Sequence, residues 1–328
     1  MEKHGRELVS PPEDAISRAR FSLHSNKLLV SSWDSSVTLY DVDENVARVK
    51  FSHPTQPLDC CFLDDFNGLS GDSDGTVRRY NFSTQKEDIL GKHEALVNSV
   101  EFSEVTGQII TGSWDKNLRF WDARVADGSE RTAVHKCEQP AIVECMSLAG
   151  YYLVVASGIT TINIYDLRNV SRPMQERRSP LKYKTVSIGC YPNHLGYAIG
   201  SVDGRVALEF FDLSESLQTN SYAFRCLPKS RNATCSLSAA VNAIEYHPIY
   251  GSFSTGDNDG YCLTWNGEKK KMLYQYPRYP SSIASLSYNR DGQLLAVASS
   301  YTYQGDEKMN ETTHIFIENV NDAHASIV

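Results

Sequence analysis

Short runs of apolar and β-branched residues recur along the whole chain, and small polar turns separate them. The segments Leu118–Trp121 and Val206–Phe211 are typical, because they are rich in the aromatic and branched residues that favour strands. No long window shows the periodicity of an amphipathic helix. The pattern therefore predicts an all-β protein built from many short strands.

A larger pattern also repeats: two short strands, a turn that often contains Asp, and a third strand that ends in an aromatic residue followed by Asp or Asn. The clear endings are Tyr40-Asp41, Tyr80-Asn81, Trp121-Asp122, Tyr165-Asp166, Phe211-Asp212 and Trp265-Asn266, and a degenerate one falls near Glu318-Asn319. The first endings lie 40 and 41 residues apart, within the period of about 40–45 residues of WD repeats. The longer later spacings indicate loop insertions.

The turns before the third strands repeat as well. They read Ser32-Trp33-Asp34, Asp72-Ser73-Asp74-Gly75, Gly112-Ser113-Trp114-Asp115, Ser201-Val202-Asp203-Gly204 and Asp257-Asn258-Asp259-Gly260. Asp and Gly suit tight hairpins because they tolerate positive φ and bond local backbone groups. A unit of this size cannot bury a core alone, but units arranged radially bury the faces between neighbours.

The repeats predict a single seven-bladed WD-repeat β-propeller over residues 6–320. Its units are expected at about 16–41, 58–82, 96–122, 141–166, 184–212, 240–266 and 282–320, with a short polar tail at 321–328. The last unit has three clear strands, so we expect Arg6–Ser10 to supply its outer strand and close the ring. In the third unit His93 is expected to be structural. It should join Ser113, Asp115 and Trp121 in a hydrogen-bonded set.

Composition and missing motifs narrow the function. The net charge of −8 argues against general nucleic-acid binding, which needs cations to neutralise phosphates. The eight cysteines lack Cys-x-x-Cys zinc spacing, and we expect reduced thiols in a nuclear or cytoplasmic protein. Neither a secretory signal nor a membrane helix is expected. Phosphate-loop, nucleophile-elbow and metalloprotease motifs are absent, so we expect no enzymatic role, cofactor or metal.

Candidate binding residues gather in turns that a propeller places on one face, its top face. Trp33 and Trp114 stand at hairpin tips, where a large aromatic side chain has no core to fill. Tryptophan is enriched at binding hot spots because it buries a large area with few rotatable bonds. The alternative is that each ring packs over its neighbouring blade.

Four basic residues are expected near one rim of the same face. Arg205 lies in the turn of the fifth unit, Arg225 follows on its predicted outer strand, and Lys182 and Lys184 enter the same blade. Two neighbouring arginines suit bidentate binding of a carboxylate or phosphate. Independent solvated charges are the alternative.

Two weaker signals remain open. Trp121-Asp122-Ala123-Arg124 matches the Trp-Asp-x-Arg pattern of propellers that serve as substrate receptors of cullin-RING ubiquitin ligases, and Tyr165-Asp166-Leu167-Arg168 matches it in part. The run Lys269-Lys270-Lys271 is either a solvated hairpin or a nuclear-import signal.

Longer strings are more specific than the repeat. They include Ser31-Ser32-Trp33-Asp34, Thr111-Gly112-Ser113-Trp114-Asp115, Gly204-Arg205-Val206-Ala207, Tyr222-Ala223-Phe224-Arg225-Cys226 and Leu295-Ala296-Val297-Ala298-Ser299-Ser300-Tyr301. In these segments, from about Pro11 to Val320, the chain resembles the Bub-three family of mitotic checkpoint proteins, and it looks most like the plant members. A messenger-RNA export or microtubule-associated propeller is a further alternative.

The resemblance implies a non-enzymatic adaptor of the spindle assembly checkpoint, found in nucleus and cytoplasm and at kinetochores in mitosis. Such proteins bind a motif of checkpoint kinases and pseudokinases across the top face, and phosphorylated Met-Glu-Leu-Thr repeats of a kinetochore scaffold. Arg205 and Arg225 match positions implicated in phosphothreonine recognition, and Trp33 and Trp114 match top-face aromatics. A monomer acting within larger complexes is expected.

The chain also departs from the family pattern. Basic or polar family residues are replaced at Thr160, Val186, Gly189 and Leu227. These losses predict a weaker contact with the acidic kinase motif and a diverged paralogue. The candidates to compensate are Lys184, Lys229 and Arg231.

Overall fold

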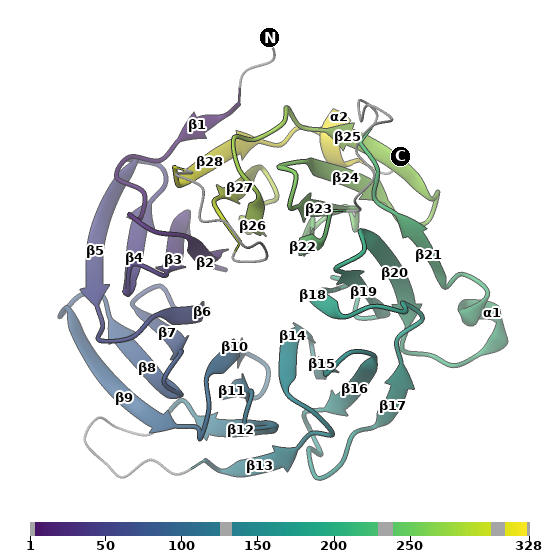
Figure 1. Cartoon of the computed structure of the whole chain (residues 1–328), viewed down its shortest axis with the longest axis horizontal. Helices are drawn as coiled ribbons and strands as arrows, with labels where there is room; N and C mark the ends of the chain where they lie inside the picture. Colours follow the sequence, from purple (N-terminus) through teal and green to yellow (C-terminus); the bar gives the residue numbers. More distant parts are fainter. Residues whose placement is uncertain (1–3, 125–132, 229–238, 303–311, 327–328) are drawn as a thin grey trace.

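The computed structural model describes residues 4–124, 133–228, 239–302 and 312–326. Within these ranges, seven antiparallel four-stranded sheets stand as blades around a common centre (Figure 1). In each blade, neighbouring strands are hydrogen bonded in order from the centre outward. The prediction of an all-β, seven-bladed propeller is confirmed.

From the innermost strand outward, the four strands of each blade follow one another along the chain, except that β1 is the outer strand of blade 7. Blade 1 consists of β2 (Ile16–Phe21), β3 (Lys27–Ser32), β4 (Ser36–Asp41) and β5 (Val46–Ser52), and blade 2 of β6 (Pro57–Asp64), β7 (Asn67–Asp72), β8 (Thr76–Asn81) and β9 (Lys86–Lys92). Blade 3 consists of β10 (Val97–Ser103), β11 (Gln108–Ser113), β12 (Asn117–Asp122) and β13 (His135–Glu138), and blade 4 of β14 (Val143–Ala149), β15 (Tyr152–Ser157), β16 (Thr161–Asp166) and β17 (Gln175–Arg178). Blade 5 consists of β18 (Thr185–Cys190), β19 (Gly196–Ser201), β20 (Arg205–Phe210) and β21 (Tyr222–Arg225), and blade 6 of β22 (Val241–Tyr246), β23 (Phe253–Asp257), β24 (Cys262–Asn266) and β25 (Lys271–Gln275). Blade 7 consists of β26 (Ile283–Tyr288), β27 (Leu294–Ser299), β28 (His314–Asn319) and β1 (Arg6–Glu7). Two short helices, α1 (Glu215–Gln218) and α2 (Asp322–Ala325), lie outside the sheets.

The core lies between the blades. Leu28 and Val30 of β3 share one cluster with Ala296 of β27 and Ile315 of β28, so the first and last blades pack on each other. Second strands such as β3 and β27 are buried along almost their whole length because a neighbouring blade covers each face. This double burial explains why they read as continuous apolar runs, whereas the outer strand β5 is mostly accessible.

The ring closes through the N-terminal segment. Arg6 pairs with Ile317 in β28, and the Leu8 N–H donates to the Ile315 carbonyl at 2.9 Å. The expected outer strand of blade 7 is therefore confirmed. It spans Arg6–Glu7 rather than Arg6–Ser10, and the φ of 53° at Ser10 lies outside the extended region of a strand.

The segment after β28 is also packed onto the ring. Ala325 of α2 is buried, and the His324 ring stacks on Tyr274 of β25 with centroids 3.9 Å apart. Residues 322–325 therefore contact blade 6, next to the blade that contains both β1 and β28 (Figure 1).

The predicted hydrogen-bonded set of blade 3 exists with one change. Nδ1 of His93 lies 2.9 Å from Asp115, and its Nε2 lies 2.8 Å from the Thr111 hydroxyl, which also accepts the Trp121 indole N–H at 2.9 Å. Thr111, which the prediction did not include, thus joins His93 to Trp121, while Ser113 belongs to the set through Asp115. The Ser113 hydroxyl accepts the Asp115 N–H at 3.0 Å. Burial lowers the pKa of His93 although Asp115 opposes this shift, which fits a structural ring.

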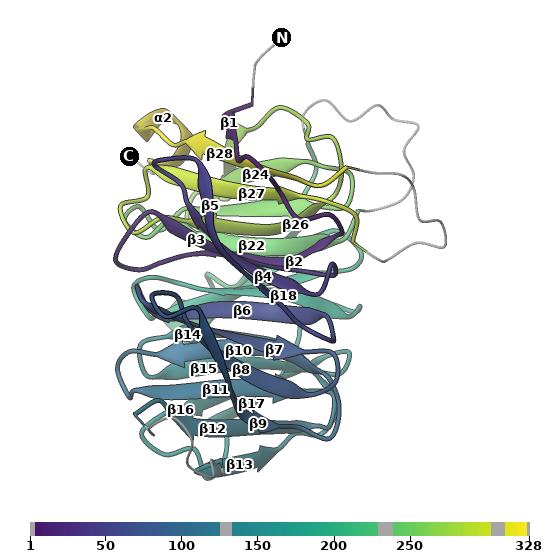
Figure 2. The ribbon, with the colours of Figure 1, turned by 90° about the vertical axis from the view of Figure 1, so that its left-hand side faces the viewer.

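The strands run between two faces that carry the loops (Figure 2). The turns between second and third strands and the connections from one blade to the next lie on one face, called the top face below. The hairpins between first and second strands and between third and fourth strands lie on the lower face. This arrangement follows from four antiparallel strands per blade.

Candidate peptide-binding face

The fold places every predicted site residue on the top face. Trp33 follows β3, Trp114 follows β11, Arg205 begins β20, Arg225 ends β21, and Lys182 and Lys184 lie in the connection from β17 to β18. They do not form one pocket, because the tryptophans lie on blades 1 and 3 and the basic residues on or before blade 5. A ligand that contacts all of them must extend across the face.

Arg205 and Arg225 are brought directly together. They are opposite partners in the β20–β21 register, and the Cys226 N–H donates to the Gly204 carbonyl at 2.9 Å just beyond them. Both side chains are exposed. Like charges directly opposite each other destabilise a sheet. Asp203 lies 3.2 Å from Arg205, and Arg225 has no ion-pair partner among the described residues, so the pair carries excess positive charge suited to an anion.

The two predicted lysines differ in what they offer a ligand. Lys182 is exposed on the top face. The Lys184 ammonium instead lies 2.9 Å from the carboxylate of Glu144 on β14, whose side chain is only 7% exposed. An anion that bound Lys184 would compete with this buried carboxylate, so Lys184 adds less to the face than its position suggests.

The two tryptophans occupy equivalent turns. Their backbone N–H groups donate to carbonyls in the preceding connections, Trp33 to Ala15 at 2.9 Å and Trp114 to Leu96 at 3.0 Å. These bonds fix the turns and direct both residues to the top face. Trp114 is 42% exposed, whereas Trp33 is partly covered. Trp114 therefore offers the larger free aromatic surface.

The centre of the ring contains a charged cluster that the sequence does not indicate. Arg20 of β2 donates two 2.8 Å hydrogen bonds to Glu101 of β10, and Asp59 of β6 lies 3.7 Å from the same guanidinium. Glu245, on the inner strand β22 of blade 6, interacts electrostatically with Arg18, Arg20 and Glu101. Burial raises the pKa of Glu245 to about 7, although Arg18 and Arg20 act in the opposite direction.

Sequence reasoning also missed exposed apolar side chains on the top face. Ile159, Tyr183 and Leu227 lie in loops near the basic residues, and each is exposed. The signal was present in the sequence, since large apolar residues are unusual in turns and connections.

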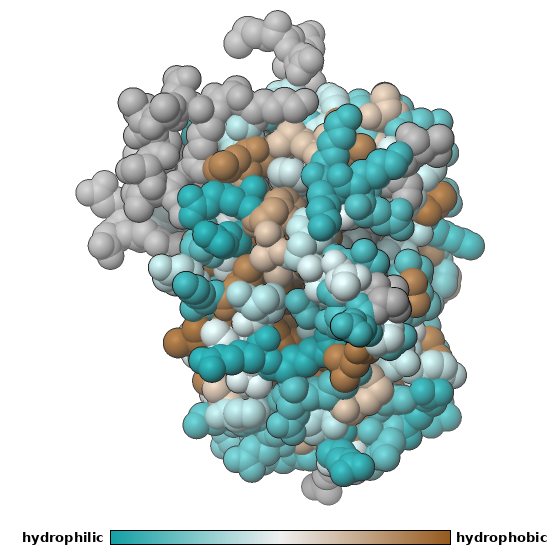
Figure 3. Space-filling model, turned by 90° about the vertical axis from the view of Figure 1, so that its right-hand side faces the viewer, coloured by the Kyte–Doolittle hydropathy of each residue, from teal (hydrophilic) through white to brown (hydrophobic). Residues whose placement is uncertain are grey.

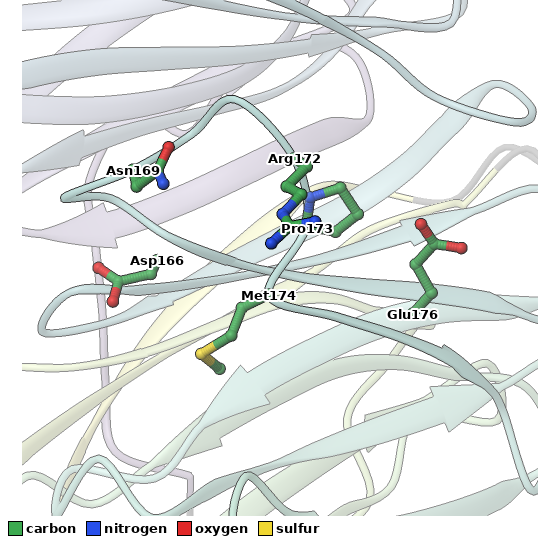
Figure 4. Close-up of a pocket in the computed structure, with 6 residues that line it drawn as sticks. All are labelled: Asp166, Asn169, Arg172, Pro173, Met174 and Glu176. Atoms are coloured by element: carbon green, nitrogen blue, oxygen red, sulfur yellow. The ribbon is translucent and has the colours of Figure 1, made fainter.

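Concave surface occurs on the lower face. One hollow in blade 4 is lined by Asp166, Asn169, Arg172, Pro173, Met174 and Glu176 (Figure 4). A second lies where blade 6 meets the segment after β28, around Tyr250 and Asp322. Neither hollow is lined by a predicted site residue.

Within the described ranges, no cluster of three or more His, Cys, Asp or Glu residues has the geometry of a metal site. Among the same residues, no helix has the length and apolar character needed to cross a membrane.

Comparisons with known proteins agree with this architecture. Residues 85–122 match the family model of the WD domain, G-beta repeat. The chain is 55% identical over 318 residues to the mitotic checkpoint protein BUB3.1 of Arabidopsis thaliana, covering 97% of this chain and 93% of that protein. It is 39% identical to BUB3.3 of the same plant, covering 95% of this chain and 97% of that protein. A solved structure described as U3-55K has a TM-score of 0.78 and 14% identity, covering 96% of this chain and 98% of that chain, and shows the shared fold.

Fold and repeat together define a WD-repeat β-propeller. The long, nearly complete matches are more specific than the fold. The chain belongs to the BUB3 family of mitotic checkpoint proteins, and the resemblance seen in its sequence is confirmed.

Proposed function

We propose that this protein is a spindle-checkpoint adaptor that binds phosphothreonine in Met-Glu-Leu-Thr-type kinetochore peptides with Arg205 and Arg225. The observation that carries the proposal is their direct opposition across β20 and β21. A phosphate brings nearly two negative charges and three strong acceptor oxygens to such a pair. Phosphorylation by a kinase would therefore switch docking on.

The proposed adaptor also binds a checkpoint-kinase or pseudokinase motif across the top face. Trp114 supplies exposed aromatic surface and Lys182 an exposed cation for this contact. It is the weaker of the two contacts, because basic family positions are replaced and Lys184 is engaged by Glu144. Lys229 and Arg231, the other candidates to compensate, lie outside the described residues.

The test measures binding of a phosphorylated Met-Glu-Leu-Thr peptide by fluorescence anisotropy. Two charge-assisted contacts of about 1.5–3 kcal/mol each imply that Arg205→Glu with Arg225→Glu weakens binding at least about a hundredfold. The control is Arg172→Glu with Arg290→Glu, which makes the same charge change at two exposed arginines of the lower face. Undiminished binding by the first double variant refutes the assigned pocket.

Localisation tests the cellular half of the proposal. An adaptor of this kind resides in nucleus and cytoplasm and gathers at unattached kinetochores, acting as a monomer within larger complexes without catalysis. Imaging a tagged copy through mitosis should show kinetochore signal in prometaphase. The double variant Arg205→Glu with Arg225→Glu should lose this signal while its soluble level stays unchanged.

A second candidate function, substrate receptor of a cullin-RING ubiquitin ligase, is favoured by one observation. Arg124 and Arg168 follow the third strands of neighbouring blades and pair with Asp122 and Asp166 at 2.9 and 2.6 Å. The Arg124 side chain is 85% exposed and available to a partner on the lower face. This candidate predicts that Arg124→Ala loses a ligase adaptor in pull-down, and an unchanged pull-down rejects it.

A further inference from the structure

Exposed apolar side chains recur at one structural position on the lower face. Six blades carry such a residue at the tip of the hairpin between the first and second strands: Leu23, Phe66, Val105, Tyr151, Leu195 and Ile249. On the side of the ring that carries β21 and α1, by contrast, apolar side chains form separate patches in a largely hydrophilic surface (Figure 3). An exposed apolar side chain gains free energy when a partner covers it, so these hairpin tips are candidates for contact with another protein.

The hairpin tips of blades 1, 2 and 3 contact one another. Their inner strands lie side by side, with β6 between β2 and β10 (Figure 1). The Ser25 hydroxyl of the first hairpin donates to the Asp65 carboxylate of the second at 2.8 Å. Nε2 of His24, also in the first hairpin, lies 3.1 Å from the Glu104 carboxylate of the third. The three tips therefore form one continuous part of the lower face.

We call Leu23, Phe66 and Val105 the lower apolar patch. Each is the sequence neighbour of a residue that joins the hairpins, and their exposed fractions are 58%, 60% and 51%. The Asp64 carboxylate accepts the Phe66 N–H at 2.7 Å, which fixes the tip of the second hairpin. A surface that is already ordered loses less conformational entropy when a partner binds it.

Carboxylates dominate the charge around the lower apolar patch. The three hairpins contain Asp64, Asp65 and Glu104 but neither lysine nor arginine between the strands that they join. Lys27 follows the first hairpin, and its ammonium donates to the Asp65 carbonyl at 3.1 Å and lies 5.6 Å from the centre of the Phe66 ring. Three carboxylates against one lysine leave an excess of negative charge. Such a surface favours a cationic partner and disfavours an anionic one.

The other exposed hairpin tips differ from this patch in charge rather than in apolar character. The equivalent hairpins of blades 5 and 6 carry Leu195 and Ile249 but contain no carboxylate between their strands. In blade 4 the Arg168 guanidinium lies 5.0 Å from the centre of the Tyr151 ring, so a cation already covers that tip. The acidic surroundings therefore distinguish the tips of blades 1 to 3.

We propose that the lower apolar patch docks a segment of a partner protein in which lysine or arginine accompanies bulky apolar residues. The apolar side chains of the segment cover the patch, and its cations face the carboxylates of the three hairpins. The contact lies on the face opposite Arg205 and Arg225, so it does not depend on the proposed phosphopeptide site. An adaptor with this second site holds one partner on each face at the same time.

The test selects short random peptides displayed on phage against the full protein. Peptides that also bind the triple variant Leu23→Ser, Phe66→Ser, Val105→Ser are removed first, which discards binders of the top face. The remaining peptides should be enriched in lysine or arginine together with bulky apolar residues. A synthetic copy of the most enriched peptide, followed by fluorescence anisotropy, should bind the triple variant at least about tenfold more weakly than the unsubstituted protein, which corresponds to about 1.4 kcal/mol.

A second variant isolates the charge of the hairpins. Asp64→Asn with Glu104→Gln removes two negative charges but keeps an oxygen acceptor at each position. It should weaken binding of the same peptide about fivefold, which corresponds to about 1 kcal/mol, and reduce the dependence of binding on salt. Circular dichroism verifies that both variants are folded. If the triple variant is not, the charge variant takes its place in the removal step and in the binding assay.

Two controls separate this site from the other surfaces. Leu195→Ser with Ile249→Ser removes similarly exposed side chains from the equivalent tips of blades 5 and 6 and should leave peptide binding unchanged. Arg205→Glu with Arg225→Glu should also leave it unchanged, because these arginines lie on the top face.

Three outcomes would overturn the inference. The selection yields no peptide that depends on the patch, the enriched peptides lack cations, or the protein self-associates in analytical ultracentrifugation and the triple variant does not. The last result makes a second copy of this chain the occupant. Each of these outcomes leaves phosphate-dependent binding by the top face unaffected, so failure of this inference is distinguishable from failure of the proposed function.

Discussion

The Thr111 hydroxyl accepts the indole N–H of Trp121 at 2.9 Å and lies 2.8 Å from Nε2 of His93. The buried Thr111 hydroxyl on β11 thus joins the β9–β10 connection, which carries His93, to β12, which carries Trp121. In blade 6, Thr255 accepts the Trp265 indole N–H at 2.9 Å in the same way. Because a buried donor without a partner is costly, these hydroxyls stabilise their blades.

Thr111→Val should lower the free energy of unfolding by about 1–3 kcal/mol, because it removes a partner from two buried groups while preserving shape. Thr255→Val is the matched comparison and should cost less, since beside the Trp265 indole N–H the Thr255 hydroxyl meets the Cys226 thiol, a weaker hydrogen-bonding group than the His93 ring. Urea unfolding followed by tryptophan fluorescence measures both. Equal costs would show that the contact between His93 and Thr111 adds nothing.

Residue type alone did not identify Thr111. Alternate residues of a strand point to the same side, so Thr111 and Ser113 are both candidates for the bond to Trp121. The sequence favours Ser113 at the strand end, whereas the β11–β12 pairing brings Thr111 into position. Register, which depends on the whole hairpin, decided between two otherwise similar hydroxyls.

The same limit applies to the candidate site. The recurring aromatic-Asp endings predict the ring and the placement of Arg225 on an outer strand. They do not predict that Arg205 faces Arg225, because a long connection containing α1 separates their strands. The bond between Arg20 and Glu101 joins blades 1 and 3 at the centre, and such contacts exist only once the ring has formed.

His53 should make stability depend on pH. Burial lowers its pKa to about 4, whereas an unfolded histidine titrates near about 6.5. As the pH falls, His53 therefore gains its proton in the unfolded chain before it does so in the folded protein. Its contribution to the free energy of unfolding is present above about pH 6.5 and is lost as the pH falls towards about 4. His53 should therefore lower the urea midpoint as the pH falls across this window, whereas Glu245, described below, acts in the opposite direction.

His53→Gln isolates this effect. Nε2 of His53 lies 3.0 Å from the Tyr80 hydroxyl, and at the equivalent position of blade 4 Gln139 donates to the Tyr165 hydroxyl at 2.7 Å. Glutamine can therefore preserve the contact without titrating. As the pH falls from about 6.5 to 4, the variant should become more stable relative to the unsubstituted protein. The exposed replacement His135→Gln is the control, and a slope unchanged by His53→Gln contradicts the assignment.

Glu245 should act with the opposite sign. Its folded pKa is about 7, above the value of about 4.3 for an unfolded glutamate. The unfolded chain therefore loses its proton first as pH rises, and the contribution of Glu245 to stability declines between about 4.3 and 7. Glu245→Gln should raise stability by up to about 3 kcal/mol near pH 8 and change little near pH 4. The exposed control Glu268→Gln should be neutral at both, and a destabilised Glu245→Gln at high pH would contradict the burial argument.

Closure of the ring depends on a glycine at the N-terminal segment. The Gly5 N–H donates to the Glu318 carboxylate at 2.9 Å, and a β-carbon at this position would collide with the backbone carbonyl of Ile317. Gly5→Ala should therefore displace β1 from β28 and lower stability by about 1–3 kcal/mol. Thermal unfolding measures the effect, with Val9→Ala, an exposed replacement just beyond β1, as the control. Alanine at position 5 cannot fit while β1 stays paired with β28. An unchanged melting temperature would therefore mean that this pairing contributes little to the stability of blade 7.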